Sequence, residues 1–163
     1  DILFEMGANI TIYNKRLENS EQIADITVTS SQLVATEIKG EIIPRLIDEI
    51  PILAVAACFA KGKTVIRDAG ELKVKESDRI ATTASELSKL GAKIEKTADG
   101  MIILGQQPLI GASVNSHDDH RLAMSMAIAG LMAKGQTVIG HADVVKISYP
   151  HFWADLESIA KFQ

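Results

Sequence analysis

Two nearly all-apolar stretches dominate the hydrophobic pattern of the chain: IPILAVAACFA at 50–60 and LAMSMAIAGLMA at 122–133. Elsewhere, apolar and polar positions alternate or recur at helical spacing. Both stretches are well short of the ~20 residues that a membrane-spanning helix needs. They are therefore predicted to be helices buried in a globular core.

Almost the same residues follow each of these stretches. AKGKTVI stands at 60–66 and AKGQTVI at 133–139. Gly62 and Gly135 are predicted to end the helices as left-handed caps, and Thr-Val-Ile is typical of a short strand. The chain thus repeats a unit of helix, cap and strand, and this repeat is the strongest sign of its organisation.

A second echo pairs LFEMGANI at 3–10 with LSKLGAKI at 87–94. In the later copy, apolar spacing predicts a helix from about Asp78 to Leu90 that ends at Gly91 and leads into a strand around 93–95. The first copy keeps only the tail of this helix, so we expect the chain to be cut from a longer protein. From its first residues, DILFEMGANI, no targeting segment is expected.

The remaining elements are predicted to be strands and one final helix. Strict alternation of apolar and polar residues predicts strands in NITIYN at 9–14, DITVTS at 25–30 and LVATEI at 33–38. Asp99-Gly100 is typical of a hairpin turn. Ser148 as a cap and Pro150 in the first turn predict a last helix through Ile159. This order predicts an α/β sandwich of βαβαββ units, in one domain or in two repeats of one.

Charge and composition exclude several kinds of partner. The net charge is −4 and no basic face is evident, so nucleic acid and membranes are not expected as partners, and any bound anion needs a local cluster of cations. The single cysteine, Cys58, lies in an apolar stretch and is expected to be a buried, reduced thiol of a cytoplasmic protein. No glycine-rich phosphate loop, CxxC pair or Ser-His-Asp pattern is present, so cofactor chemistry is not indicated.

The stretch KVKESDRI at 73–80 concentrates charge at the start of a predicted helix. Ser77 or Asp78 is expected to cap this helix, which typically contributes ~1 kcal/mol. Arg79 would face the positive end of the helix dipole, which costs roughly a few tenths of a kcal/mol. That cost suggests a second use for this cation.

The same arrangement returns in HDDHRLAM at 117–124. Asp118 or Asp119 would cap the helix, with His120 and Arg121 in its first turn. An arginine beside the free amides of a helix start suits a phosphate or a carboxylate, and the recurrence favours two anion sites over two solvated surface clusters. A metal site is not expected, because adjacent His and Asp side chains at one helix start cannot converge on a single ion.

The stretch IDEIP at 47–51 precedes the first apolar helix. Asp48 and Glu49 stand just before Pro51, which suits a first helical turn. From the residues alone, an N-terminal cap with favourable dipole pairing is the favoured interpretation.

Four motifs together resemble the C-terminal portion of the EPSP synthase family (5-enolpyruvylshikimate-3-phosphate synthases). They are IPRLIDEIPILAVAACFAKGKTVIRDAGEL, LKVKESDRI, DDHRLAMSMAIAGL and ISYPHFWADLESI, in this order. The resemblance implies an inverse α/β barrel enzyme of two domains, each built from three βαβαββ units. This chain, 1–163, would hold about two units of one domain, roughly 8–90 and 91–163, and its partners would include the absent N-terminal part of the enzyme.

The resemblance also implies a reaction. Family members transfer the enolpyruvyl group of phosphoenolpyruvate to the 5-hydroxyl of shikimate 3-phosphate, giving EPSP and phosphate, in aromatic amino-acid biosynthesis and without metal or organic cofactor. By the same resemblance, seven residues have implied roles: Asp48 as candidate base and shikimate 3-phosphate contact, Glu76 as acid, Lys75 on the sugar-like substrate, and Arg79, His120, Arg121 and Lys146 at phosphoenolpyruvate. The position of Lys146 varies within the family.

Two features depart from or mimic the family pattern. Lys73 stands where arginine is common, outside the direct chemistry. TSSQL at 29–33 mimics a phosphate-binding element of the other domain, and we interpret Ser30 to Gln32 as the rim of a strand.

Two alternatives remain. A UDP-N-acetylglucosamine enolpyruvyl transferase would share the fold and the donor, but that family lacks the KESDR motif and uses a cysteine elsewhere. A folded, non-catalytic fragment that binds anions weakly is the second alternative, and the isolated chain is expected to show no measurable turnover.

Overall fold

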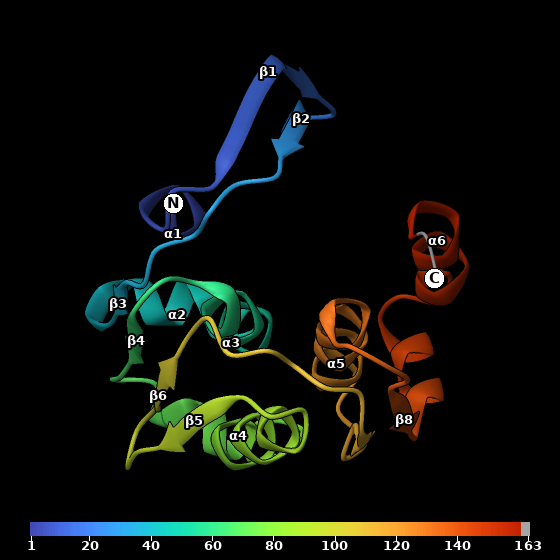
Figure 1. The fold of residues 1–163 in the computed structure, drawn as a ribbon. Coiled ribbons are helices and arrows are strands. Elements are labelled where there is room, and N and C mark those ends of the chain that lie inside the picture. The colour runs from blue at the N-terminus through green and yellow to red at the C-terminus, as the bar shows by residue number, and fades with distance from the viewer. Residues whose placement is uncertain (161–163) are drawn as a thin grey trace.

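The computed structural model describes residues 1–160 and shows an α/β fold in which three helices pack on one another and short strands lie around them (Figure 1). The helices are α1 (Ile2–Glu5), α2 (Ile43–Leu46), α3 (Ile50–Phe59), α4 (Arg79–Lys89), α5 (His120–Met132) and α6 (Phe152–Ile159). The strands are β1 (Asn9–Glu18), β2 (Glu21–Thr29), β3 (Glu37–Ile38), β4 (Lys63–Ile66), β5 (Lys93–Lys96), β6 (Met101–Leu104), β7 (Ser113–Asn115) and β8 (Val138–Gly140). Short 3-10 helices are η1 (Gly40–Ile42), η2 (Gly70–Val74) and η3 (Ala142–Ile147).

The strands form one four-stranded and two two-stranded sheets. In the larger sheet the order is β3-β4-β6-β5, with β3 parallel to β4 and the hairpin β5-β6 antiparallel to it. The hairpin β1-β2 and the parallel pair β7-β8 form the other two sheets. From β3 to β6 the element order is βαβαββ, as the sequence predicts. The division into units at 8–90 and 91–163 stays a prediction.

The AKG repeat occupies equivalent places in the two halves of the chain. After α3, the amide of Lys61 donates to Leu33 O, and after α5 the amide of Lys134 donates to Leu109 O. The next residues enter β4 and β8, which both run parallel to a partner strand. The repeated sequence therefore forms a repeated structure.

The second echo is structural as well. Gly7 and Gly91 both have positive φ, of 82° and 91°, immediately after a helix. The carbonyls of Met6 and Leu90 then accept from the amides of Val34 and Ile110 at 2.8 Å in both cases. The predicted turn from helix into strand is thus present twice.

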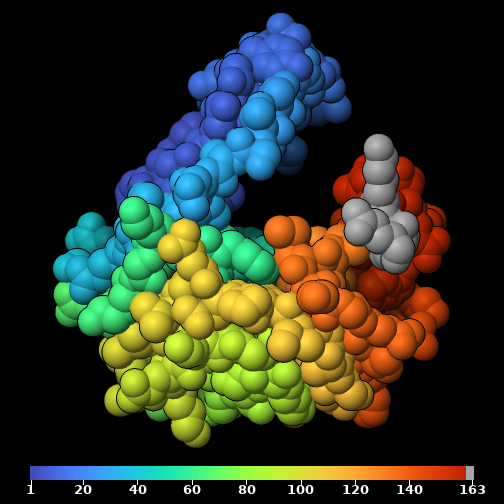
Figure 2. Space-filling model, in the orientation of Figure 1, coloured from blue at the N-terminus to red at the C-terminus, as the bar shows by residue number. Residues whose placement is uncertain are grey.

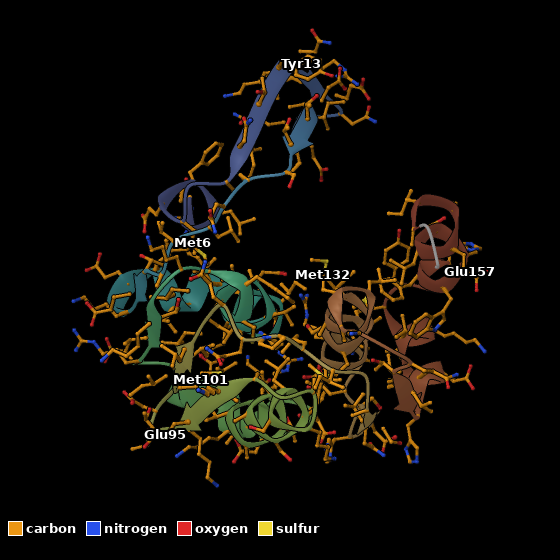
Figure 3. All side chains as sticks on the ribbon, viewed as in Figure 1. Met6, Tyr13, Glu95, Met101, Met132 and Glu157 are labelled. Atoms are coloured by element: carbon orange, nitrogen blue, oxygen red, sulfur yellow. The ribbon has the colours of Figure 1, made fainter. Side chains whose placement is uncertain are left out.

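The core lies between α3, α4 and α5 and the inner face of the four-stranded sheet. Leu53, Ala54 and Cys58 of α3 are buried, as are Met126 and Ala129 of α5. The all-apolar character of these two helices therefore reflects burial on several sides, as predicted. In Figure 3, Met101 of β6 lies within the body while Glu95 of β5 lies at its edge. Among the described residues, no helix has the length and apolarity that crossing a bilayer requires.

The hairpin β1-β2 projects from the body, with Tyr13 midway along β1 (Figures 2 and 3). Ile12 pairs with Ile26 on one face of the hairpin, and both side chains are exposed. Ser31 lies just beyond β2, where its Oγ accepts from the amide of Asn9 at 3.1 Å. This position fits the interpretation of Ser30 to Gln32 as the rim of a strand.

Three local predictions are wrong. Gly62 and Gly135 have positive φ, but they do not cap the helices, since α3 and α5 end at the extended residues Ala60 and Ala133. The final helix begins at Phe152, and not at the predicted Ser148 and Pro150. The reason is that η3 continues to Ile147, where the amide of Ser148 still donates to Val145 O. Of the strand predicted at 33–38, only β3 and an isolated bridge at Val34 form.

Candidate active site

One arginine joins the starts of three helices. Arg79 is the first residue of α4, and its side chain is only 1% exposed. Its guanidinium donates to three carboxylates: Nε to Asp119 Oδ2 at 2.7 Å, Nη1 to Asp48 Oδ1 at 2.8 Å, and Nη2 to Glu76 Oε2 at 2.7 Å. Asp119 precedes α5, Asp48 precedes α3 and Glu76 precedes α4. We call the side chains of Arg79, Asp48, Glu76 and Asp119 the Arg79 cluster.

Two aspartates fix the helix starts that carry the cluster. Asp78 caps α4 by accepting from the amide of Ala81 at 3.1 Å, and Asp119 caps α5 by accepting from the amides of Arg121 and Leu122. Of the alternatives left open by the sequence, Asp78 and Asp119 are therefore the caps. Ser77 donates instead to Asp119 Oδ2 at 3.1 Å.

Asp48 and Glu49 do not cap α3 with their side chains. Asp48 faces Arg79, whereas Glu49 Oε1 accepts from Arg121 Nη1 at 2.8 Å. The same Nη1 donates to the Asp48 carbonyl at 3.2 Å, and Arg121 Nη2 lies 3.7 Å from Asp48 Oδ2. The capping interpretation is wrong because the carboxylates of Asp48 and Glu49 both accept hydrogen bonds from an arginine. Pro51 does lie in the first turn of α3, as predicted.

Three other predicted site residues, Lys75, His120 and Lys146, lie outside the Arg79 cluster. Lys75 donates to Glu71 at 2.7 Å, and this bond together with the nearby charge of Asp48 raises the lysine pKa. His120 opens α5 and is half-buried. Lys146 donates to Asp143 on η3 and is 66% exposed, and in the described part of the chain no ion pair joins it to the cluster.

The electrostatics keep the two aspartates of the cluster ionised. Burial alone would raise the pKa of Asp119, but the hydrogen bond and charge of Arg79 outweigh burial and hold that pKa below its ordinary value. The same balance, with Arg121 adding its charge, lowers the pKa of Asp48. Burial acts to lower the pKa of Arg79, yet its carboxylate partners raise it. Arg79, Asp48 and Asp119 therefore form a charged network at neutral pH.

The cluster has a buried side and an exposed side. Asp119 is 0% exposed, whereas Asp48 and Glu76 are 48% and 46% exposed. Two carboxylates that can reach a bound molecule thus lie beside the guanidinium groups of Arg79 and Arg121. Such a set can hold an anion and exchange a proton with it.

Sequence reasoning underestimated Asp119, which it treated only as a helix cap. The sequence signal that could have indicated a site role for Asp119 was its position in DDHR, directly before the predicted site residues His120 and Arg121. Across residues 1–160, no three His, Cys, Asp or Glu side chains group in a way that could hold a metal ion.

Comparison with known proteins places these features in a family. Residues 1–156 match the EPSP synthase family (3-phosphoshikimate 1-carboxyvinyltransferase). Among curated relatives named 3-phosphoshikimate 1-carboxyvinyltransferase, that of a Roseiflexus species is 56% identical over 99% of this chain and 37% of its own length. That of Gloeobacter violaceus is 57% identical over 98% of the chain and 37% of its own length. The chain thus spans little more than a third of these relatives.

Solved structures agree with the sequence comparison. An EPSP synthase from Acinetobacter baumannii superposes with a TM-score of 0.93 at 39% identity, covering 98% of this chain and 38% of that one. The enolpyruvyl transferase NikO from Streptomyces tendae shares the fold, with a TM-score of 0.73 at 21% identity over 98% of this chain and 34% of that one. The chain therefore has the enolpyruvyl transferase fold. Within that class, it belongs to the EPSP synthase family.

Cys58 takes no part in the cluster. It is buried in α3, and burial raises the pKa of its thiol to about 12. A thiol in this state is not a nucleophile at neutral pH. The family match disfavours the UDP-N-acetylglucosamine enolpyruvyl transferase alternative.

Proposed function

We propose that the protein containing this chain transfers the enolpyruvyl group of phosphoenolpyruvate to the 5-hydroxyl of shikimate 3-phosphate, releasing phosphate. The reaction serves aromatic amino-acid biosynthesis in the cytoplasm and needs no organic cofactor or metal. The observation that carries the proposal is the pairing of two half-exposed carboxylates, Asp48 and Glu76, with the guanidinium of Arg79. Membership of the EPSP synthase family supports the assignment of the substrates.

The exposed carboxylates have separate roles in this proposal. Asp48 contacts shikimate 3-phosphate and accepts the proton of the attacking hydroxyl, while Glu76 donates a proton to the methylene carbon of phosphoenolpyruvate. Lys75 lies near Asp48 and contacts the same substrate, and Arg121 with His120 faces the phosphoenolpyruvate anion. Fixed cations hold the anions, and the two carboxylates change protonation state.

Arg79 binds phosphoenolpyruvate by exchanging partners. Each of its three nitrogen atoms already donates to a carboxylate and the side chain is only 1% exposed, so an incoming carboxylate or phosphate competes with these partners. Asp119 is buried and also caps α5, whereas Asp48 and Glu76 are half-exposed. The exchange therefore occurs at Asp48 or Glu76, and Asp119 keeps the guanidinium in place. The Lys146 side chain donates a hydrogen bond to Asp143, and it can reach phosphoenolpyruvate only after that hydrogen bond breaks.

A second candidate is a non-catalytic fragment that binds anions weakly. The three carboxylates around Arg79 favour it, since they neutralise the guanidinium in the chain by itself. Under this alternative, cations from the rest of the enzyme are required before an anion can bind.

Two measurements test the proposal. Amide NMR of this chain with phosphoenolpyruvate and shikimate 3-phosphate should give saturable shifts at 76–79 and 119–121. In the full-length protein, Glu76→Gln should reduce kcat by about a hundredfold or more, because the proton donor is lost. Glu95→Gln, on the exposed edge of β5, is the matched control.

Each result separates the alternatives. Shifts confined to the two helix starts support a preformed half-site. A well-dispersed spectrum without shifts favours the fragment alternative. Phosphate release by the isolated chain that Glu76→Gln abolishes would contradict the expectation that this chain alone is inactive. An unchanged kcat for Glu76→Gln in the full-length protein would refute the assignment of Glu76.

A further inference from the structure

A second buried carboxylate lies on α4, about two helical turns after Arg79. The side chain of Glu86 is completely buried, and it points to the loop that precedes α5 rather than to solvent. The motifs shared with the family do not include it, and the cluster around Arg79 does not contact it.

Glu86 accepts hydrogen bonds from both sides of the α4–α5 contact. From the loop before α5, the backbone amide of Asn115 donates to Oε2 at 2.9 Å, and His117 Nε2 donates to Oε1 at 2.9 Å, since a carboxylate can only accept. From its own helix, Lys89 Nζ donates to both oxygens, at 2.7 and 2.8 Å. Burial alone would raise the pKa of Glu86, but these donors lower it. The carboxylate is thus fully bonded and charged.

The loop that Glu86 contacts has an unfavourable backbone conformation at two residues. His117 and Asp118 both have positive φ, of 51° and 58°, which residues other than glycine rarely adopt. Local bonds support this turn: the amide of His117 donates to Asn115 Oδ1, and the amide of Asp118 donates to Ser116 Oγ. The next residue is Asp119, the cap of α5. Two consecutive left-handed residues therefore set the direction from which Asp119 approaches Arg79.

We propose that Glu86 is a positioning residue for the candidate active site: by holding Asn115 and His117 it fixes the turn at 117–118, and through that turn it places Asp119, His120 and Arg121 against Arg79. The functional part of this inference rests on the proposed binding of phosphoenolpyruvate. The positioning part does not, because it concerns the geometry of the free chain.

Asp119 is held at its side chain by Arg79 and Ser77. The turn before it is held by Glu86 on the α4 side and by bonds of Ser116 and Asp118 to His141 on the other side. Without the bonds from Glu86, the α4 side of the turn can relax toward ordinary backbone angles, and the first turn of α5 then moves. A shift of the helix start misplaces Arg121 relative to the ligand without unfolding the core.

The test compares Glu86→Gln with Lys89→Gln in the full 163-residue chain. Glu86→Gln keeps the shape of the side chain but weakens its acceptor to Asn115 and His117. Lys89→Gln removes a donor to the same carboxylate without touching the loop. We measure hydrogen exchange of the Arg121 and Leu122 amides, which donate to Asp119, in the absence of ligand. Exchange at both should be about tenfold faster or more in Glu86→Gln and unchanged in Lys89→Gln.

Three outcomes refute the positioning role: unchanged exchange at Arg121 and Leu122 in Glu86→Gln, equal acceleration in Lys89→Gln, or uniform acceleration that extends through α3. The last would show that Glu86 only stabilises the whole fold. Should Glu86→Gln fail to fold, His117→Asn decides the question, because asparagine tolerates positive φ while losing the bond to Glu86. The same local acceleration is expected there, and its absence refutes the proposal.

A ligand titration separates this inference from the proposed function. Phosphoenolpyruvate should bind Glu86→Gln about tenfold more weakly than the unmodified chain, with Lys89→Gln within about twofold. If the unmodified chain gives no shifts, its function as a preformed half-site fails, but the exchange data still decide whether Glu86 positions α5. If the unmodified chain binds and Glu86→Gln binds equally well, the functional part of the inference is wrong.

Discussion

The Asp119 carboxylate accepts a 2.7 Å hydrogen bond from Arg79 Nε at a place where the two side chains are 0% and 1% exposed. Removing one partner of such a pair leaves the other charge buried and poorly compensated. Asp119→Ala should therefore lower the free energy of unfolding by about 3–5 kcal/mol, which also includes loss of the α5 cap. Urea unfolding followed by circular dichroism measures this.

The neighbouring aspartate supplies the control for that measurement. Asp118 is exposed, and asparagine tolerates its positive φ of 58°. Asp118→Asn should change the unfolding free energy by less than about 0.5 kcal/mol. Equal losses at 118 and 119 would show that general loop damage, and not the buried ion pair, explains the effect.

Acid should destabilise the chain through the cluster. Asp48 and Asp119 have folded-state pKa values below the ordinary 3.8. For a depressed carboxylate pKa, the stabilisation is complete above the unfolded value and is lost as the pH falls through the folded value. Stability should thus hold above about pH 5 and decline as the pH falls through 4 and below. Thermal melts from pH 7 to pH 2 test this, and Asp119→Asn should flatten the decline. An identical pH profile for the variant would exclude Asp119 as its source.

The Cys58 thiol should be inert in the folded chain. Burial raises its pKa to about 12, so little thiolate exists at pH 8 and the reagent cannot reach it. A disulfide reagent should label Cys58 at least about a hundredfold more slowly in the native chain than in urea. Rapid native labelling would mean that α3 opens readily.

Gly105 should not tolerate a side chain. A Cβ there would overlap the carbonyl oxygen of Ala60 and come within 2.6 Å of the carbonyl oxygen of Ala57. Because backbone atoms cannot move aside like a side-chain tip, Gly105→Ala should cost about 2–3 kcal/mol in chemical unfolding. At Gly70 the nearest atom to such a Cβ is 4.0 Å away, so Gly70→Ala is the control and should be nearly neutral.

The sequence predicted the elements best where a local signal was repeated. The AKG repeat marked β4 and β8, and Ile80, Ala84 and Leu87 marked the buried face of α4. The helix ends were harder. α3 stops at Phe59, before Gly62, because β6 leads into Gly105 and Gln106, whose backbone approaches the end of the helix: the amide of Gln106 donates to Cys58 O at 2.9 Å. No local pattern records such a contact.

The candidate site was predicted residue by residue but not as a network. Asp48, Glu76, Arg79 and Arg121 do meet, yet their bonds to one another depend on how three helices approach. The sequence suggested a cap at Asp48, since a carboxylate before Pro51 suits a helix start. The nearby guanidinium competes more strongly for that carboxylate. Glu86 has no local signal, because a glutamate in an amphipathic helix is ordinarily solvated.

The three bonds of Arg79 make α3, α4 and α5 thermodynamically interdependent. If any one of these helices detaches completely, a buried guanidinium loses a counter-charge, and the penalty falls on all three. Partial openings that release a single helix are therefore rare relative to openings of the whole group. These helices form one cooperative folding unit, whereas the β1-β2 hairpin, whose side chains are largely exposed, is free to open independently of it.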